Sequence, residues 1–163
     1  MRGVVANQLV DNYLSGKKHS EERLRYCHVI PWGKIFKFNF LTKNKAKFEE
    51  IPVGNDIMFG TLTGSWAYRI GAYNVLMYYV TNRDGSLTQL KSSVYTRCRF
   101  AVRIRQRVYM VQFGKPQYAM DLFRYSIKYV LPISVKDWIW CLGEMVKHRI
   151  NPFVCLYKIK LYL

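Results

Sequence analysis

Between residues 97 and 107 basic and apolar side chains alternate, and this stretch constrains the fold more than any other part of the sequence. Five arginines occupy odd positions: Arg97, Arg99, Arg103, Arg105 and Arg107. The even positions include Cys98, Phe100, Val102 and Ile104. Successive side chains of a β-strand point to opposite faces, so the pattern predicts a long strand over residues 94–113 with one core face and one cationic face.

Strand signals recur from residue 34 onward. Residues 34–41 place three phenylalanines on one face, which is typical of a half-buried strand. The largely apolar run 73–80 predicts a strand buried on both faces. Gly64 and the Asp84-Gly85 turn separate such segments. The pattern predicts an all-β sandwich or barrel with a short helical piece at 117–124 and strands at 34–41, 57–63, 66–80, 94–113, 125–133, 138–142 and 153–162.

Residues 1–30 are predicted to form a mildly basic N-terminal arm, ahead of a single β-sandwich domain of residues 31–163. Apolar residues on one side of residues 2–15 indicate a short helix that Gly16 ends. Four basic residues follow, Lys17, Lys18, Arg23 and Arg25, and two glutamates between them dilute their charge.

The chain carries 26 Lys and Arg against 10 Asp and Glu, a formal charge of +16 at pH 7. A surplus of this size indicates a negatively charged partner, with nucleic acid first and an anionic membrane second. Guanidinium groups about 7 Å apart on a strand face repel one another unless anions lie between them. We therefore expect nucleic-acid phosphates, without base-specific readout, at Arg97, Arg99, Arg103, Arg105, Arg107, Lys17, Lys18, Arg23 and Arg25. The alternative is a solvated outer strand face whose arginines pair with carboxylates from neighbouring strands. The chain has only ten Asp and Glu, which are too few to favour this alternative.

Nothing in the sequence predicts a catalytic or metal centre. The three histidines, His19, His28 and His148, have no metal-ligand spacing with one another or with cysteine. There is no phosphate-binding loop, dinucleotide fingerprint or nucleophile elbow. We expect neither enzymatic activity, nor a cofactor, nor a small-molecule substrate. Neither a secretory signal nor a membrane span is predicted, and four widely spaced cysteines favour a reducing compartment.

The second half of the chain resembles the coat proteins of small single-stranded DNA viruses of the geminivirus and nanovirus kind. Residues 99–116 (RFAVRIRQRVYMVQFGKP) resemble their arginine-bearing strand and Gly-Pro turn, and residues 123–131 (FRYSIKYVL) resemble the next, aromatic-basic strand. Residues 137–142 (DWIWCL) and 151–163 (NPFVCLYKIKLYL) are similar to their last two strands. The mild N-terminal arm departs from the dense Arg/Lys arm that is usual in such proteins.

This resemblance implies an eight-stranded jelly-roll sandwich that self-assembles into an icosahedral shell around its genome. The implied partners are nucleic acid, single-stranded DNA before RNA, and further copies of the chain. The implied location is the virion and the host nucleus or cytoplasm. Two other functions are open, and the first of them explains the charge equally well. One is a monomeric RNA-binding protein of the ribosomal type. The other is a matrix protein that bridges an anionic membrane and nucleoprotein through the N-terminal helix.

Overall fold

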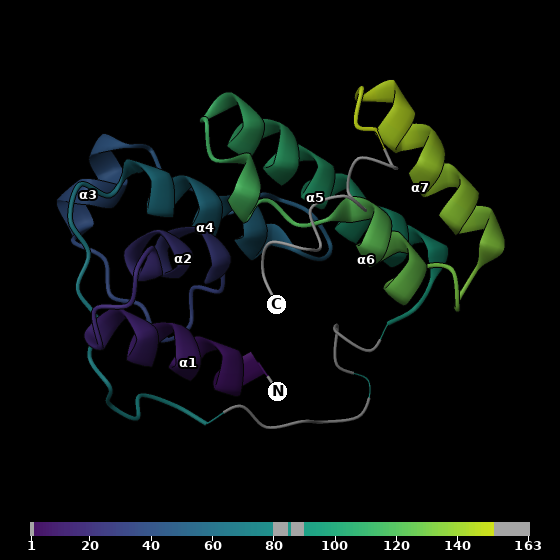
Figure 1. Ribbon diagram of the computed structural model, residues 1–163. Helices are drawn as coiled ribbons and strands as arrows, with labels where there is room; N and C mark the ends of the chain where they lie inside the picture. The colour runs from purple at the N-terminus through teal and green to yellow at the C-terminus, as the bar shows by residue number, and fades with distance from the viewer. Residues whose placement is uncertain (1, 80–84, 86–89, 152–163) are drawn as a thin grey trace. The chain divides into compact units, whose positions relative to one another are not determined.

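The computed structural model describes residues 2–79, 85 and 90–151, and every regular element within these ranges is a helix (Figure 1). No β-strand occurs there, so the predicted all-β, eight-stranded jelly-roll sandwich is wrong. The predicted strand 153–162 lies outside the described residues, as does most of the predicted turn around Asp84.

The chain divides into two compact units. Unit 1 comprises residues 1–50 and 55–84, and unit 2 comprises residues 51–54 and 85–163. The segment predicted as a separate arm, residues 1–30, therefore lies in the same unit as residues 31–50. The part predicted as one β-sandwich domain, 31–163, is divided between the two units.

The described part of unit 1 contains α1 (Arg2–Leu14), α2 (Ser20–Cys27), α3 (Phe38–Lys43) and α4 (Asn55–Trp66). Helix α1 agrees with the short helix expected from the sequence, and Gly16 follows it with a φ of 67°, a conformation that favours glycine. Helix α2 packs against both α1 and α4. The predicted strand 34–41 instead ends in α3, and the predicted strand 57–63 lies within α4.

Helix α4 approaches the backbone around α2 at two glycines. A Cβ atom on Gly60 would lie 2.0 Å from the carbonyl oxygen of Val29, and one on Gly64 would lie 2.3 Å from the carbonyl oxygen of Arg25. Only a residue without a side chain permits backbones to pass this closely. Gly64, predicted as the boundary between two strands, is therefore an internal packing position of a helix.

Residues 67–79 follow α4 without forming a helix or strand. Their side chains are largely exposed, with Tyr73 at 84% and Tyr79 at 81%. The prediction of a strand buried on both faces is wrong for residues 73–79, because no neighbouring strand exists in the described ranges to pair with this segment.

The described part of unit 2 contains α5 (Ser93–Gln112), the 3-10 helix η1 (Pro116–Tyr118), α6 (Leu122–Tyr129) and α7 (Val135–Lys147). Helix α5 packs against α6 and α7, and those two helices pack against each other. Asp121 and Ser134 are the N-caps of α6 and α7, since their side-chain oxygens accept hydrogen bonds from backbone N–H groups three residues on. The predicted strands 125–133 and 138–142 thus lie largely in helices. The core of the unit contains Phe100, Ile104, Leu122, Val130, Cys141 and Met145.

The predicted strand 94–113 is almost entirely helix α5, and the burial pattern explains the error. Buried residues recur every four positions in two series, Thr96, Phe100 and Ile104, and then Val102, Gln106 and Met110. Both series fall on even positions, so a helix that is buried on two sides reproduces the alternation of a strand. Arginines tolerate the odd positions because their aliphatic stems cover apolar surface while the guanidinium groups extend to solvent or to polar partners.

Candidate nucleic-acid interface

The positive charge of the chain is concentrated in unit 2. The sequence of this unit has fourteen Lys and Arg against three acids, whereas unit 1 has twelve against seven. The three acids of unit 2 all have local roles. Asp137 pairs with Arg97, Glu144 lies 3.5 Å from Lys147, and Asp121 caps α6. Unit 2 therefore carries the larger surplus, and its surface is the better match for a polyanion.

Helix α5 distributes the five arginines over several sides instead of one. Residues two positions apart on an α-helix point about 200° apart, so the predicted single cationic face does not form. Three of the arginines recur every four positions and share one side: Arg99, Arg103 and Arg107. We call these three residues the arginine line.

Arg97 points into a buried ion pair. Its Nε donates to Oδ1 of Asp137 at 2.8 Å, and the side chain of Asp137 is only 1% exposed. A hydrogen bond from the Ser93 hydroxyl, and then the Arg97 guanidinium, hold the pKa of the Asp137 carboxyl below its usual value against the opposing effect of burial. The Arg97 guanidinium also lies 5.1 Å from the ring centre of Trp140. These contacts give Arg97 a structural role between α5 and α7.

Backbone and amide oxygens orient the arginine line. Nη1 of Arg99 donates to the carbonyl oxygen of Leu90 at 2.8 Å, and Nη1 of Arg103 donates to Oε1 of Gln106 at 3.0 Å. Nη1 of Arg107 lies 3.4 Å from the carbonyl oxygen of Met120, just before α6. These three contacts orient the guanidinium groups.

A shallow, open groove runs along α6 and has a volume of about 270 Å³. Within it the ring centres of Tyr125 and Tyr129 are 5.0 Å apart, with an angle of 44° between the rings. Nζ of Lys128 lies 5.2 Å from the ring centre of Tyr129. Aromatic and cationic side chains therefore line the groove together. Its lining residues are Met120, Asp121, Arg124, Tyr125, Lys128 and Tyr129.

Tyr125 connects the groove with the arginine line. Burial raises the pKa of the Tyr125 hydroxyl, while the charges of Arg103 and Arg99 oppose this rise, so both guanidinium groups act on the same hydroxyl. Arg107 contacts the backbone of Met120, which also lines the groove. Basic side chains of α5 and α6 therefore adjoin the same groove.

The α6 residues were not among the predicted contacts, although the sequence contains a signal for them. The pairs Arg124-Tyr125 and Lys128-Tyr129 repeat a basic and an aromatic residue at a spacing of four. On a helix this spacing places like residues on one side, whereas the predicted strand 125–133 sent neighbouring residues to opposite faces.

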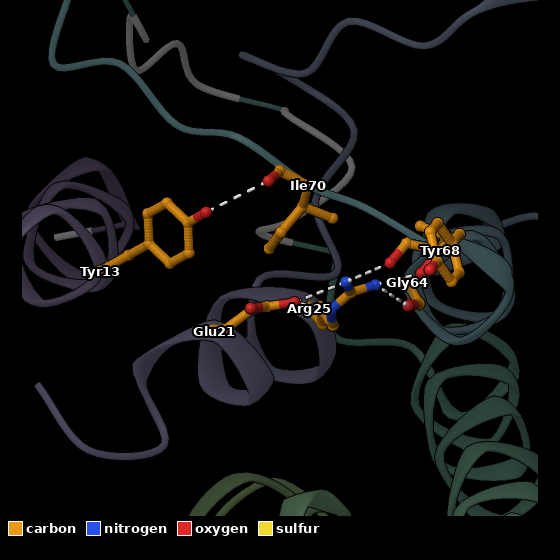
Figure 2. Close-up of polar contacts among 7 residues, drawn as sticks. Tyr13, Glu21, Arg25, Gly64, Tyr68 and Ile70 are labelled. Carbon is orange, nitrogen blue, oxygen red and sulfur yellow. Dashed lines mark hydrogen bonds and ion pairs between the residues drawn. The ribbon is translucent and has the colours of Figure 1, made fainter. Parts of the chain in front are cut away.

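Arg25, one of the predicted contacts in residues 1–30, has a structural role within unit 1 (Figure 2). Its side chain is 9% exposed, and its Nε donates to Oε1 of Glu21 at 2.9 Å. The guanidinium also donates to the carbonyl oxygens of Gly64, Ala67 and Tyr68, where α4 ends. Arg25 thus supplies donors to carbonyl groups that the end of a helix leaves without partners.

The other predicted contacts of this segment, Lys17, Lys18 and Arg23, are exposed on unit 1. The hydroxyl of Tyr13, on α1, donates to the carbonyl oxygen of Ile70 at 3.1 Å (Figure 2). Like Arg25, Tyr13 therefore contacts the segment that follows α4 in this unit. The arginine line and the groove belong to unit 2, so the predicted set of nine residues does not form a single site within either unit.

Within residues 2–79, 85 and 90–151, no group of three His, Cys, Asp or Glu side chains is placed to bind a metal ion. No helix in these ranges combines the length and the apolarity that crossing a membrane requires. No model of a known protein family matches the sequence, and searches of curated proteins and of solved structures give no match either.

Proposed function

We propose that this chain is a non-enzymatic nucleic-acid-binding protein and that the α5–α6 surface of unit 2 makes the contact. The observation that carries the proposal is that basic residues of both helices adjoin one groove: Arg124 and Lys128 of α6 line it, and Arg107 of α5 contacts the backbone of Met120, which also lines it. Phosphates suit such a surface because arginine binds them in bidentate geometry and lysine as a point charge.

The concentration of charge in unit 2 supports the same partner. A polyanion gains most from binding where basic residues are numerous and acids are already occupied by local contacts. The coat-protein function expected from the sequence required a jelly roll, and the helices remove that basis. We therefore keep nucleic acid as the proposed partner and do not propose that the chain forms a capsid shell.

The test uses fluorescence anisotropy with a labelled 20-nucleotide single-stranded DNA over a series of salt concentrations. The variant Arg124→Gln/Lys128→Gln removes two charges from exposed positions of α6. We expect a weaker complex and a log-affinity against log-salt slope that is shallower by about 0.7 for each lost contact with a single strand. A second variant, Arg103→Gln/Arg107→Gln, should give the same direction of change from α5.

The matched comparison is Lys17→Gln/Lys18→Gln, which removes the same charge from exposed positions of unit 1. If the α5–α6 surface makes the contact, this variant retains the wild-type slope. An equal loss of affinity in Lys17→Gln/Lys18→Gln and in Arg124→Gln/Lys128→Gln would show that general charge, and not this surface, binds the DNA. The absence of measurable binding by the wild-type protein at low salt would overturn the proposed function itself.

A further inference from the structure

We infer that the groove on α6 binds one unpaired base of a single strand, with the ring of Tyr129 as its stacking surface. The inference rests on the proposed function and adds the form of nucleic acid that the site accepts. Tyr129 is 50% exposed at the surface, while its neighbour Tyr125 packs with the fully buried Phe100 at 6.3 Å between ring centres. One ring is thus fixed to the core, and the other is available to a ligand.

The size of the groove limits what it accepts. Its volume of about 270 Å³ lies just below the range of roughly 300–1,000 Å³ that is usual for sites of drug-sized ligands and cofactors. It is also open along one side, so a chain that enters and leaves the groove fits better than an enclosed molecule. A single flat ring attached to a longer polymer meets both conditions.

The basic residues beside the tyrosines match the two phosphates that flank such a base in a single strand. Arg124 and Lys128 lie one helical turn apart, on either side of Tyr125 in the sequence, and their Cβ atoms are about 5–6 Å apart. Lys128 now rests against Tyr129, a weak contact at an exposed site. A phosphate provides a stronger partner for this ammonium, so the lysine can leave the ring face when a base stacks there.

Asp121 lies at one end of the groove, where its carboxylate accepts a hydrogen bond from the backbone N–H of Arg124 at 3.0 Å. Its negative charge disfavours a phosphate at that end. The strand should therefore run with its phosphates toward Arg124 and Lys128, and away from Asp121.

A duplex does not satisfy this site. Its bases are paired and stacked inside the helix, and only an unstacked base can reach the face of a side-chain ring. Stacking is tolerant of sequence because every base has a π-face, so the groove should select single strands without selecting a sequence.

The test compares the affinity of the protein for a 20-nucleotide single strand and for the duplex of the same sequence. Replacing Tyr129 by leucine retains an apolar side chain and removes the ring. We expect Tyr129→Leu to lose about 5- to 150-fold in affinity for the single strand, which corresponds to the 1–3 kcal/mol of one stacked base, and to retain its affinity for the duplex. Tyr129→Phe should bind like the wild type, as should Tyr68→Leu, which removes a 93% exposed ring from unit 1.

Direct evidence should come from photo-crosslinking with a single strand that contains 5-iodouracil. The crosslinked peptide identified by mass spectrometry should include Tyr129. A Tyr129→Leu variant that binds both forms like the wild type would overturn the inference but leave the proposed function intact, and so would an equal loss for both forms. Failure of the wild type to bind either form would overturn the proposed function instead.

Discussion

Arg97 of α5 and Asp137 of α7 form an ion pair in which only the arginine reaches solvent. The Nε of Arg97 lies 2.8 Å from Oδ1 of Asp137, and the side-chain exposures are 35% and 1%. The hydroxyl of Ser93 donates to Oδ2 of the same carboxylate at 2.6 Å. Both carboxylate oxygens therefore have partners, which is the condition under which a buried charge is tolerated.

The Arg97→Gln variant should lower the free energy of unfolding by about 2–3 kcal/mol, because it leaves a buried carboxylate with hydroxyl partners alone. Urea titration of the purified variant measures this loss. Lys136→Gln, an exposed change on the same helix as Asp137, should stay within about 0.5 kcal/mol of the wild type. If Arg97→Gln is instead fully stable and flattens the salt slope of DNA binding, Arg97 belongs to the contact surface.

His28 should make the stability of unit 1 depend on pH. Burial, and then the positive charge of Lys34, lower the pKa of His28 from 6.5 to about 4, and Nζ of Lys34 donates to the backbone carbonyl oxygen of His28. Between these two values the unfolded chain binds a proton that the folded chain does not. The stabilisation from neutral His28 is therefore complete above pH 6.5 and is lost as the pH falls toward 4.

Urea titrations at several pH values between 7 and 4.5 provide the measurement. The wild type should lose stability across this range, and His28→Gln should remove much of the slope. His19→Gln, which changes an exposed histidine of the same unit, should leave the profile unchanged. A His28→Gln profile as steep as that of the wild type would contradict the assignment.

Two glycines within helices should respond to alanine in opposite directions. Gly60→Ala places a Cβ 2.0 Å from a carbonyl oxygen, so α4 must move away from the chain after α2, and we expect a loss of at least about 1–3 kcal/mol. The Cβ atom that Gly143→Ala adds to α7 has no other atom within 4 Å. This variant should therefore raise the free energy of unfolding by about 0.5–1 kcal/mol through helix propensity. Thermal unfolding of the two variants measures both effects. A stabilising Gly60→Ala would contradict the close approach of α4 and residue 29.

The sequence revealed the parts of the structure that depend on local signals. Gly16 correctly predicted the end of α1, and the cluster of arginines identified residues 97–107, now part of α5, as a basic segment. The alternation in α5 misled because burial on two sides of a helix has the same even-numbered pattern as one face of a strand. The same mistake hid the α6 groove, since the neighbours Arg124 and Tyr125 point to opposite faces of a strand but lie only about 100° apart on a helix. Arg25 was predicted as a phosphate contact because the sequence does not show its actual partners, the carbonyl oxygens of Gly64 and Ala67 around the end of α4, which lie about forty residues away in the chain.

Residues 71–79 should be the first place where a protease cuts the described chain. None of their main-chain N–H groups donates a hydrogen bond to another described residue, and Tyr73 and Tyr79 are more than four-fifths exposed. Brief digestion with chymotrypsin, followed by mass spectrometry, should therefore give early products that end at the tyrosines of this segment. Early cuts inside α4 or α5 would contradict the helical assignment there.

Residues 51–54 have a consequence for any attempt to isolate unit 2. They precede α4 in the sequence but belong to unit 2, where Val53 is 7% exposed and its carbonyl oxygen lies 3.5 Å from Sγ of Cys98. A fragment that begins at residue 85 lacks this valine, whose burial is worth about 1.5–3 kcal/mol, and leaves the Cys98 thiol more open to alkylating reagents. Unit 2 is discontinuous in the sequence, so no single truncation of the chain contains all of it without also retaining residues 55–84.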